Sequence, residues 1–175
     1  MAELEIKHEH SEDPATRRVG IVVGVVGILL SVVTIASHRA HTDAVIHRTE
    51  SNDLWSYYQA KKIRENTTEI AQTVLQALGG DAAKIEEPVK KLEQAKNKYS
   101  TDAEKIQDQA RDKDRETELE ERRALRFDIG EGLLELGLVL NSLFFLARKA
   151  FFPIFGGIAS IAGALMGLLG ALLAQ

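Results

Sequence analysis

Hydrophobic and polar residues are strongly separated along this chain. Both ends are rich in apolar residues, whereas the middle, from about residue 38 to residue 127, is rich in charged ones. A helix needs about 20 apolar residues to cross the hydrocarbon core of a bilayer, and three segments come close to that length. The predicted segments are a polar N-terminal tail at 1–18, a crossing at 19–37, a polar helical region at 38–127, and crossings at 128–147 and 153–174.

The first apolar segment has two other interpretations. A secretory signal peptide would be cleaved near Ala36, and Thr16-Arg17-Arg18 has a faint likeness to a twin-arginine signal. The apolar part of a signal usually has about 7–15 residues, and this segment is longer. We therefore favour a permanent membrane anchor.

The polar middle consists of helix-forming residues with one clear interruption, Leu78-Gly79-Gly80-Asp81. On both sides of it, mainly apolar residues recur at spacings of three and four, which is typical of the narrow seam of a coiled coil. The predicted seam residues are Ala60, Ile63, Thr67, Ile70, Val74 and Ala77 before the interruption, and Ile85, Val89, Leu92, Lys96, Tyr99, Ala103, Ile106 and Ala110 after it. The pattern predicts an antiparallel helical hairpin.

Residues at the interruption suit a turn between two helices. Gly79 and Gly80 favour the end of one helix, and Asp81 favours the N-cap of the next. The second helix either kinks at Pro88 or begins there. The predicted fold class is an all-α membrane protein, with three transmembrane helices and a long antiparallel helical hairpin (a coiled coil) between the first and the second.

Three crossings place the two termini on opposite sides of the membrane. The pairs Arg17-Arg18 and Arg148-Lys149 then lie on one side, which the positive-inside rule makes cytoplasmic. Several arginines also flank the crossings on the hairpin side, so the two counts nearly balance. We predict an extracytoplasmic hairpin.

Composition and motifs argue against an enzyme. The chain has no cysteine, which removes disulfides, thiolate metal sites and cysteine nucleophiles. Its net charge of −4 gives no general electrostatic reason to expect nucleic acid as a partner. Phosphate-binding, dinucleotide-binding and common hydrolase motifs are absent from the sequence. We expect no catalytic residue and no cofactor.

Polar residues inside the second crossing are the first candidate site. Asp128 opens this segment, Glu131 and Glu135 share one helix face, and Asn141 lies deeper. One interpretation is a proton or cation site inside a helix bundle. The other, which we favour, is an interfacial cap at a helix N-terminus that bonds a neighbouring helix through Ser31, Thr34 or Arg39.

Histidine and arginine at the end of the first crossing are the second candidate. His38 and His41 are three residues apart, a spacing that allows two imidazoles to bind one zinc ion. A closed zinc site needs about four ligands, and the spacing does not provide them, so we predict no metal. We favour a juxtamembrane lock, in which His38, Arg39 and His41 face the carboxylates of the second crossing.

Two further groups are singled out by residue type. Trp55, Tyr57 and Tyr58 form the aromatic cluster of the polar region, and we expect packing in the hairpin or between subunits rather than base stacking. Small residues recur at spacings that allow close helix approach in lipid, and we expect at least one of these stripes to lie between subunits. The stripe residues are Gly20, Gly24 and Gly27 in the first crossing, and Gly156, Ser160, Gly163, Gly167, Gly170, Ala171 and Ala174 in the third.

Three short stretches carry a resemblance to a known family. They are His-Arg-Ala-His-Thr at 38–42, Trp55 with Tyr-Tyr-Gln-Ala-Lys at 57–61, and Phe-Asp-Ile-Gly-Glu at 127–131. Their order between the hydrophobic segments resembles the bacterial membrane-protein family called domain of unknown function family 4337, from Arg17 to the C-terminus. The resemblance implies a bacterial membrane protein of this layout and brings no activity, substrate or cofactor.

Two functional hypotheses follow. The first is a non-enzymatic scaffold or accessory subunit in the bacterial inner membrane, which self-associates into a homo-oligomer and presents its hairpin to a larger membrane complex. The second is a homo-oligomeric proton or cation conductor that uses the intramembrane glutamates. The expected partners are the lipid bilayer and other copies of the chain, and not nucleic acid.

Overall fold

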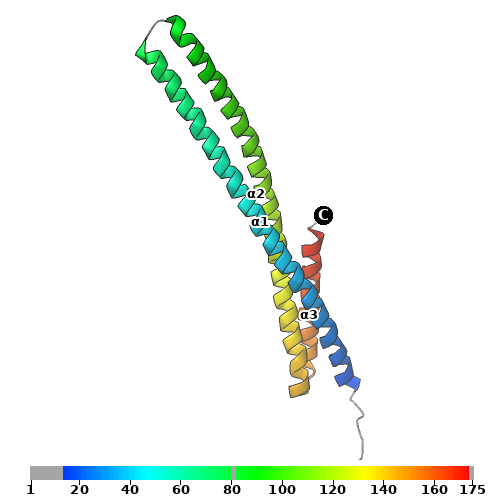
Figure 1. The fold of residues 1–175 in the computed structure, drawn as a ribbon. Helices are drawn as coiled ribbons and strands as arrows, with labels where there is room; N and C mark the ends of the chain where they lie inside the picture. Colours follow the sequence, from blue (N-terminus) through cyan, green and yellow to red (C-terminus); the bar gives the residue numbers. More distant parts are fainter. Residues whose placement is uncertain (1–13, 80–81, 174–175) are drawn as a thin grey trace, which may run out of the picture. The chain divides into compact units, whose positions relative to one another are not determined.

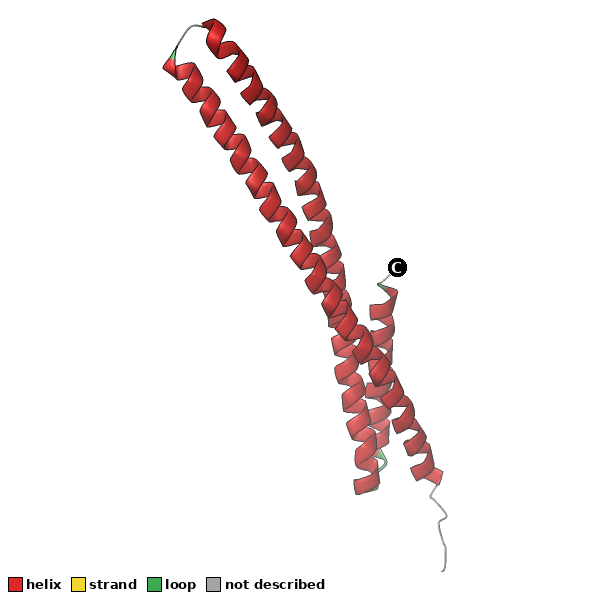
Figure 2. Ribbon diagram, viewed as in Figure 1, coloured by secondary structure: helices red, strands yellow, loops and turns green. Residues whose placement is uncertain are grey.

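The structure is a computed structural model that describes residues 14–79 and 82–173 (Figure 1). These residues form three helices, α1 (Pro14–Leu78), α2 (Ala82–Ala147) and α3 (Phe151–Leu172). No strand occurs among them (Figure 2), so the all-helical prediction is confirmed for this part of the chain. Each helix contains a stretch long and apolar enough to cross a membrane.

The ends of the helices follow from local sequence signals. Pro14 opens α1, a position where proline is tolerated because the backbone N–H would have no partner within the helix. Residues 14–18 of the predicted tail are therefore helical. α1 ends at Leu78, and Gly79 has a φ of +56°, the left-handed conformation that commonly follows a helix. The predicted turn residues Gly80 and Asp81, the tail before Pro14 and the predicted stripe residue Ala174 lie outside the described residues.

Pro88 lies inside α2, because that helix begins at Ala82. The alternative that the second helix begins at Pro88 is therefore wrong. Proline near a helix N-terminus removes only one backbone hydrogen bond, and the two alanines that open α2 favour helix strongly.

The chain divides into two compact units, of which the first holds the apolar stretches. It comprises the chain up to Ala40 together with the part from Arg122 onwards. Its hydrophobic core is built by side chains from α1 and α2: Val26, Val33, Ala40, Ala124, Phe127 and Leu134. Leu134 is fully buried.

Within this unit, α2 and α3 pack backbone to backbone. Gly137 faces Gly156 and Ser160, and Gly130 faces Gly163. A methyl group built on Gly163 would lie 2.7 Å from the carbonyl oxygen of Gly130. Glycine permits this approach because it has no Cβ, and close approach is how helices gain contact in lipid.

The second unit, His41–Glu121, is an antiparallel pair formed by α1 and α2 (Figure 1). Ion pairs along the hairpin join its two arms, among them Arg48–Glu121, Lys61–Asp102 and Glu69–Lys96. On α2 the predicted seam faces α1, because Ala103, Ile106 and Ala110 are buried and the seam residues before them are half-buried.

On α1 the predicted seam is wrong. Ile63, Ile70 and Val74 are 65%, 64% and 49% exposed. The residues of α1 that face α2 form a second stripe of the same spacing, which is largely polar: Ser51, Leu54, Tyr58, Lys61, Glu65, Thr68, Gln72 and Leu75. Hydroxyl and charged groups of this stripe bond to α2, so these contacts, rather than apolar burial, set the orientation of α1.

Candidate functional site

A two-rung hydrogen-bond ladder joins α1 to α2 in the first unit. The Thr34 hydroxyl donates to Glu131 Oε1 at 2.7 Å, and the Ser37 hydroxyl donates to Asp128 Oδ1 at 2.6 Å. The rungs are one helical turn apart on each helix, so both acids present the same face to α1. Hydrogen bonds to charged groups are stronger than neutral ones, and they offset the cost of a carboxylate in apolar surroundings.

Sequence analysis named Thr34 as a partner for these acids and missed Ser37. Ser31, which the sequence also predicts as a partner, instead donates to the backbone carbonyl of Gly27 in its own helix at 3.0 Å. Ser37 could have been found from its position one turn after Thr34, opposite the acid one turn before Glu131.

The other two polar residues of the second crossing do not join the ladder. Glu135 is exposed, and no hydrogen bond or ion pair joins it to another described residue. Asn141 is buried against Gly156 of α3, and its Nδ2 donates to the carbonyl of Gly137 at 2.8 Å. The polar residues of the second crossing therefore have different surroundings: Glu131 bonds α1, Glu135 is exposed, and Asn141 is buried against α3.

The juxtamembrane residues His38, Arg39 and His41 are all exposed. The bonds described above for Glu131 and Asp128 go to hydroxyl groups, so the proposed lock by imidazole and guanidinium stays a prediction. Across residues 14–79 and 82–173, no cluster of three or more His, Asp or Glu side chains is placed to hold a metal ion.

Basic residues gather at one end of the first unit. Arg148 follows α2 with a φ of +53°, and its Nη1 donates to the hydroxyl of Thr16 at 3.2 Å. This bond brings the connection between α2 and α3 beside the first turn of α1. The pairs Arg17-Arg18 and Arg148-Lys149 therefore lie at the same end of the unit.

The two stripes of small residues have different surroundings. On α3 the buried residues are Gly156, Ser160, Gly163, Gly167 and Gly170, and their contacts are with α1 and α2 of the same chain. On α1, a methyl group built on Gly20, Gly24 or Gly27 would meet nothing within 4 Å. The stripe of α3 thus packs between helices of one chain, and that of α1 is open.

α1 also packs less closely on α3 than α2 does. Two apolar grooves, of about 370 Å³ and 320 Å³, lie between α1 and α3 in the first unit. Val26 and Leu29 of α1 line the first, and Val33 and Phe127 line the second. Their linings suit hydrocarbon rather than a polar substrate.

In the hairpin unit, Asp114 of α2 accepts two hydrogen bonds from α1. The donors are the buried hydroxyl of Ser51 and Trp55 Nε1, the latter at 2.9 Å. The Ser51 bond, followed by that of Trp55, lowers the pKa of Asp114 from its ordinary value. The ring of Trp55 meets that of Tyr58 edge to face at 5.6 Å.

Tyr57 differs from its two aromatic neighbours because it is exposed. Lys61 Nζ lies 5.4 Å from the Tyr57 ring centroid and 5.7 Å from that of Tyr99 on α2. Trp55 and Tyr58 therefore pack within the hairpin, as expected, whereas Tyr57 leaves one face open.

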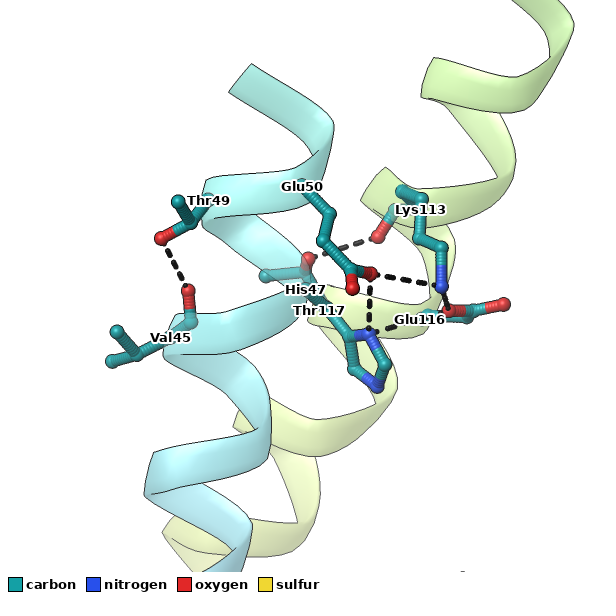
Figure 3. A network of polar contacts seen from close by, with 7 residues as sticks. All are labelled: Val45, His47, Thr49, Glu50, Lys113, Glu116 and Thr117. Carbon is teal, nitrogen blue, oxygen red and sulfur yellow. Dashed lines mark hydrogen bonds and ion pairs between the residues drawn. The ribbon is translucent and has the colours of Figure 1, made fainter. Parts of the chain in front are cut away.

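A charged network also joins the two arms of the hairpin (Figure 3). Lys113 of α2 pairs with Glu116 at 2.7 Å and with Glu50 of α1 at 3.0 Å. Nδ1 of His47 lies 3.4 Å from a carboxylate oxygen of each acid. Bonds to Glu116 and Glu50 raise the pKa of Lys113, and the bond from Lys113 lowers that of Glu50. Lys113 and the two acids have an opposite charge beside them, which is the arrangement of a structural clamp.

Comparison with known proteins gives one match. The family described as "Domain of unknown function (DUF4337)" matches residues 15–173. No curated protein and no solved structure matches the chain.

Proposed function

The chain belongs to the DUF4337 family, and we propose that it is a non-enzymatic scaffold or accessory subunit anchored in a bacterial cytoplasmic membrane. In this proposal the three apolar helices cross the bilayer and hold copies of the chain together, and the hairpin binds a larger membrane complex. Support comes from the apolar stretch in each helix and from polar contacts that join helices in pairs.

The open glycine face of α1 is the observation that carries self-association. Gly20, Gly24 and Gly27 have free space where a side chain would stand, and exposed Ile21 and Ile28 lie beside them. In lipid, helices gain little from burying apolar side chains and associate where small residues let backbones approach. This stripe is available to a second chain, because none of the described helices of its own chain occupies it.

Replacing Gly24 with leucine tests this interface. Leucine would fill the open face, so we expect the native mass of the nanodisc-held particle to shift toward the single chain. Gly132→Leu on α2 is the matched control, because a methyl group there also meets nothing within 4 Å. If Gly24→Leu keeps the mass of a particle of several chains, the proposed α1 interface is wrong. The same conclusion follows if both variants lose that mass equally.

The proposed topology places the hairpin outside the cytoplasm. It is supported by the gathering of Arg17, Arg18, Arg148 and Lys149 at one end of the first unit, since basic residues favour the cytoplasmic side. The chain lacks cysteine, so a single cysteine replacing exposed Gln94 can report the side. Labelling by an impermeant maleimide in intact cells is expected, and labelling only after lysis would reverse the topology.

A second candidate function, proton or cation conduction, is favoured by one observation. Glu135 is exposed in the crossing part of α2, with no partner among the described residues, and such acids commonly face water or another subunit. If Glu135 lines a path between subunits, Glu135→Gln abolishes ion flux into liposomes that the parent chain supports. Equal flux in both, or none in the parent, would exclude this function.

A further inference from the structure

An apolar stripe on α1 of the hairpin unit lies uncovered. Ile63 and Ile70 are 65% and 64% exposed, whereas Glu65 and Thr68 on the other side of the helix are each 9% exposed. The stripe comprises Ala60, Ile63, Thr67, Ile70, Val74 and Ala77. α1 thus buries its polar stripe on α2 and leaves its apolar stripe outside. An ordinary surface helix does the reverse, because its apolar stripe faces the core and its polar face is exposed.

The spacing of the stripe indicates that its binding partner is an α-helix. Its members follow one another at intervals of 3, 4, 3, 4 and 3 residues, so they occupy the a and d positions of a heptad. This 3.5-residue period keeps one seam facing a partner only when the partner is another α-helix wound beside it. Over 18 residues the seam is about 27 Å long, or five turns.

The flanks of the seam indicate which helix that is. The g positions are Gln59, Asn66 and Thr73, and the e positions are Arg64, Ala71 and Leu78. Charges at the e and g positions of a coiled coil set the choice of partner, because they attract opposite charges and repel like ones. Here Arg64 is the single charge at these positions. Two copies of this stripe can therefore pack side by side without like-charge repulsion.

Among the described residues of the hairpin, 41–79 and 85–121, no other surface offers a matching seam. The seam of α2 faces α1 of the same chain, and Leu119 is the one large apolar side chain that is strongly exposed among residues 85–121 of α2. Within a second copy, the surface that matches the α1 stripe is consequently the α1 stripe itself.

We propose that the α1 stripe is covered by the same stripe of further copies of this chain, in a parallel and in-register bundle of α1 arms. Parallel direction rests on the proposed function, because chains inserted the same way in one membrane are related by rotation about its normal. The anchor also raises the effective concentration of the arms, so a short seam suffices. Two of the three d positions are isoleucine, a residue that at d shifts parallel coiled coils toward three or four strands.

Disulfide trapping in the full-length chain tests the bundle directly, since the parent has no cysteine. Ile70→Cys, oxidised in native membranes, is expected to give a band of twice the chain mass on a non-reducing gel. Gln94→Cys is the matched control, because Gln94 is exposed on α2, away from its seam. We expect at least a tenfold lower yield for the control.

Register is tested by mixing two cysteine variants. Ile63→Cys and Ile70→Cys are each expected to cross-link with themselves, whereas chains carrying Ile63→Cys and Ala77→Cys are not expected to cross-link with each other. A high yield of the mixed disulfide between position 63 of one chain and position 77 of another, identified by the mass of the linked peptides, would overturn the bundle. Equal yields for Ile70→Cys and Gln94→Cys, or an adduct with a different protein, would also overturn it.

A native mass separates failure of this inference from failure of the proposed function. If the particle holds several chains but Ile70→Cys gives no cross-link, the chains self-associate and the α1 stripe is not their interface. A parent particle of one chain would remove both. As a second variant, Ile63→Gln with Ile70→Gln keeps the helix and its contacts with α2, so it should keep its helical content by circular dichroism. The same variant should lose at least half of the cross-link at Ala77→Cys.

Discussion

Replacing Gly163 with alanine adds one methyl group at the closest approach of α2 and α3. That methyl group would lie 2.7 Å from the Gly130 carbonyl oxygen, 2.8 Å from the Leu134 amide nitrogen and 2.9 Å from the Leu134 Cγ. Two of these atoms belong to the backbone of α2, so no rotation of a side chain relieves the overlap. The helices must move apart or bend.

The geometry sets the size of the effect. Bringing the closest contact from 2.7 Å to an ordinary 3.4 Å separates the helices by about 0.7 Å at this point. A gap of 0.5–1 Å forfeits about a quarter to a half of the dispersion energy of each affected contact. Overpacking of this kind costs about 1–3 kcal/mol, which exceeds the gain of about 1 kcal/mol that alanine brings over glycine in a helix.

The assay is reversible unfolding in mixed micelles, followed by circular dichroism, for Gly163→Ala and for Gly157→Ala. Gly157 is the control because it lies on the same helix and a methyl group there meets nothing within 4 Å. We expect Gly163→Ala to lower the free energy of unfolding by up to about 2 kcal/mol and Gly157→Ala to leave it unchanged or raise it by up to about 1 kcal/mol. Equal values for the two variants would refute the backbone contact between α2 and α3.

Two further predictions concern the polar contacts. Thr34→Val removes the donor to Glu131 and should lower the free energy of unfolding by about 1.5–3 kcal/mol, whereas Ser31→Val, whose hydroxyl bonds only its own helix, should change it by less than about 1 kcal/mol. The pKa of Asp114 is lowered in the folded state, so this carboxylate contributes to folding stability. The contribution is fully present above the ordinary pKa of about 3.9 and is lost as the pH falls through the lower pKa of the folded state. Asp114→Asn should therefore reduce the fall in hairpin thermal stability between pH 5 and pH 2, and an unchanged fall would show that other acids carry it.

Much of the helical layout was predictable from the sequence, because it depends on local signals. Three apolar stretches and the glycine after Leu78 suffice to predict three long helices and a reversal near residue 80. The start of α2 was not fixed by Pro88, since proline is tolerated near a helix N-terminus at the loss of one bond.

Helix partners were harder to predict than helices. α1 carries two stripes of identical spacing, and the hydrophobic pattern predicts the apolar one, with Ile63 and Ile70, as the seam with α2. The polar one took that place because Ser51 and Lys61 find partners on α2. The α3 glycines pose the same difficulty, since a stripe indicates close packing without saying which helix is close. In the ladder, Thr34 was predictable from its level opposite Glu131.

The contacts between α1 and α2 also bear on the order in which the chain assembles. Their sequence separations rise from the turn outwards, from 41 and 59 through 73 to 91 and 97 residues. Once one contact has formed, the residues of the next are already close, so each further contact closes only a short additional loop at a small entropic cost. Assembly can therefore zip from Gly79 towards the ladder at Ser37 and Thr34. A defect at the turn would then slow the joining of the first two crossings, although the turn is distant from both of them in sequence.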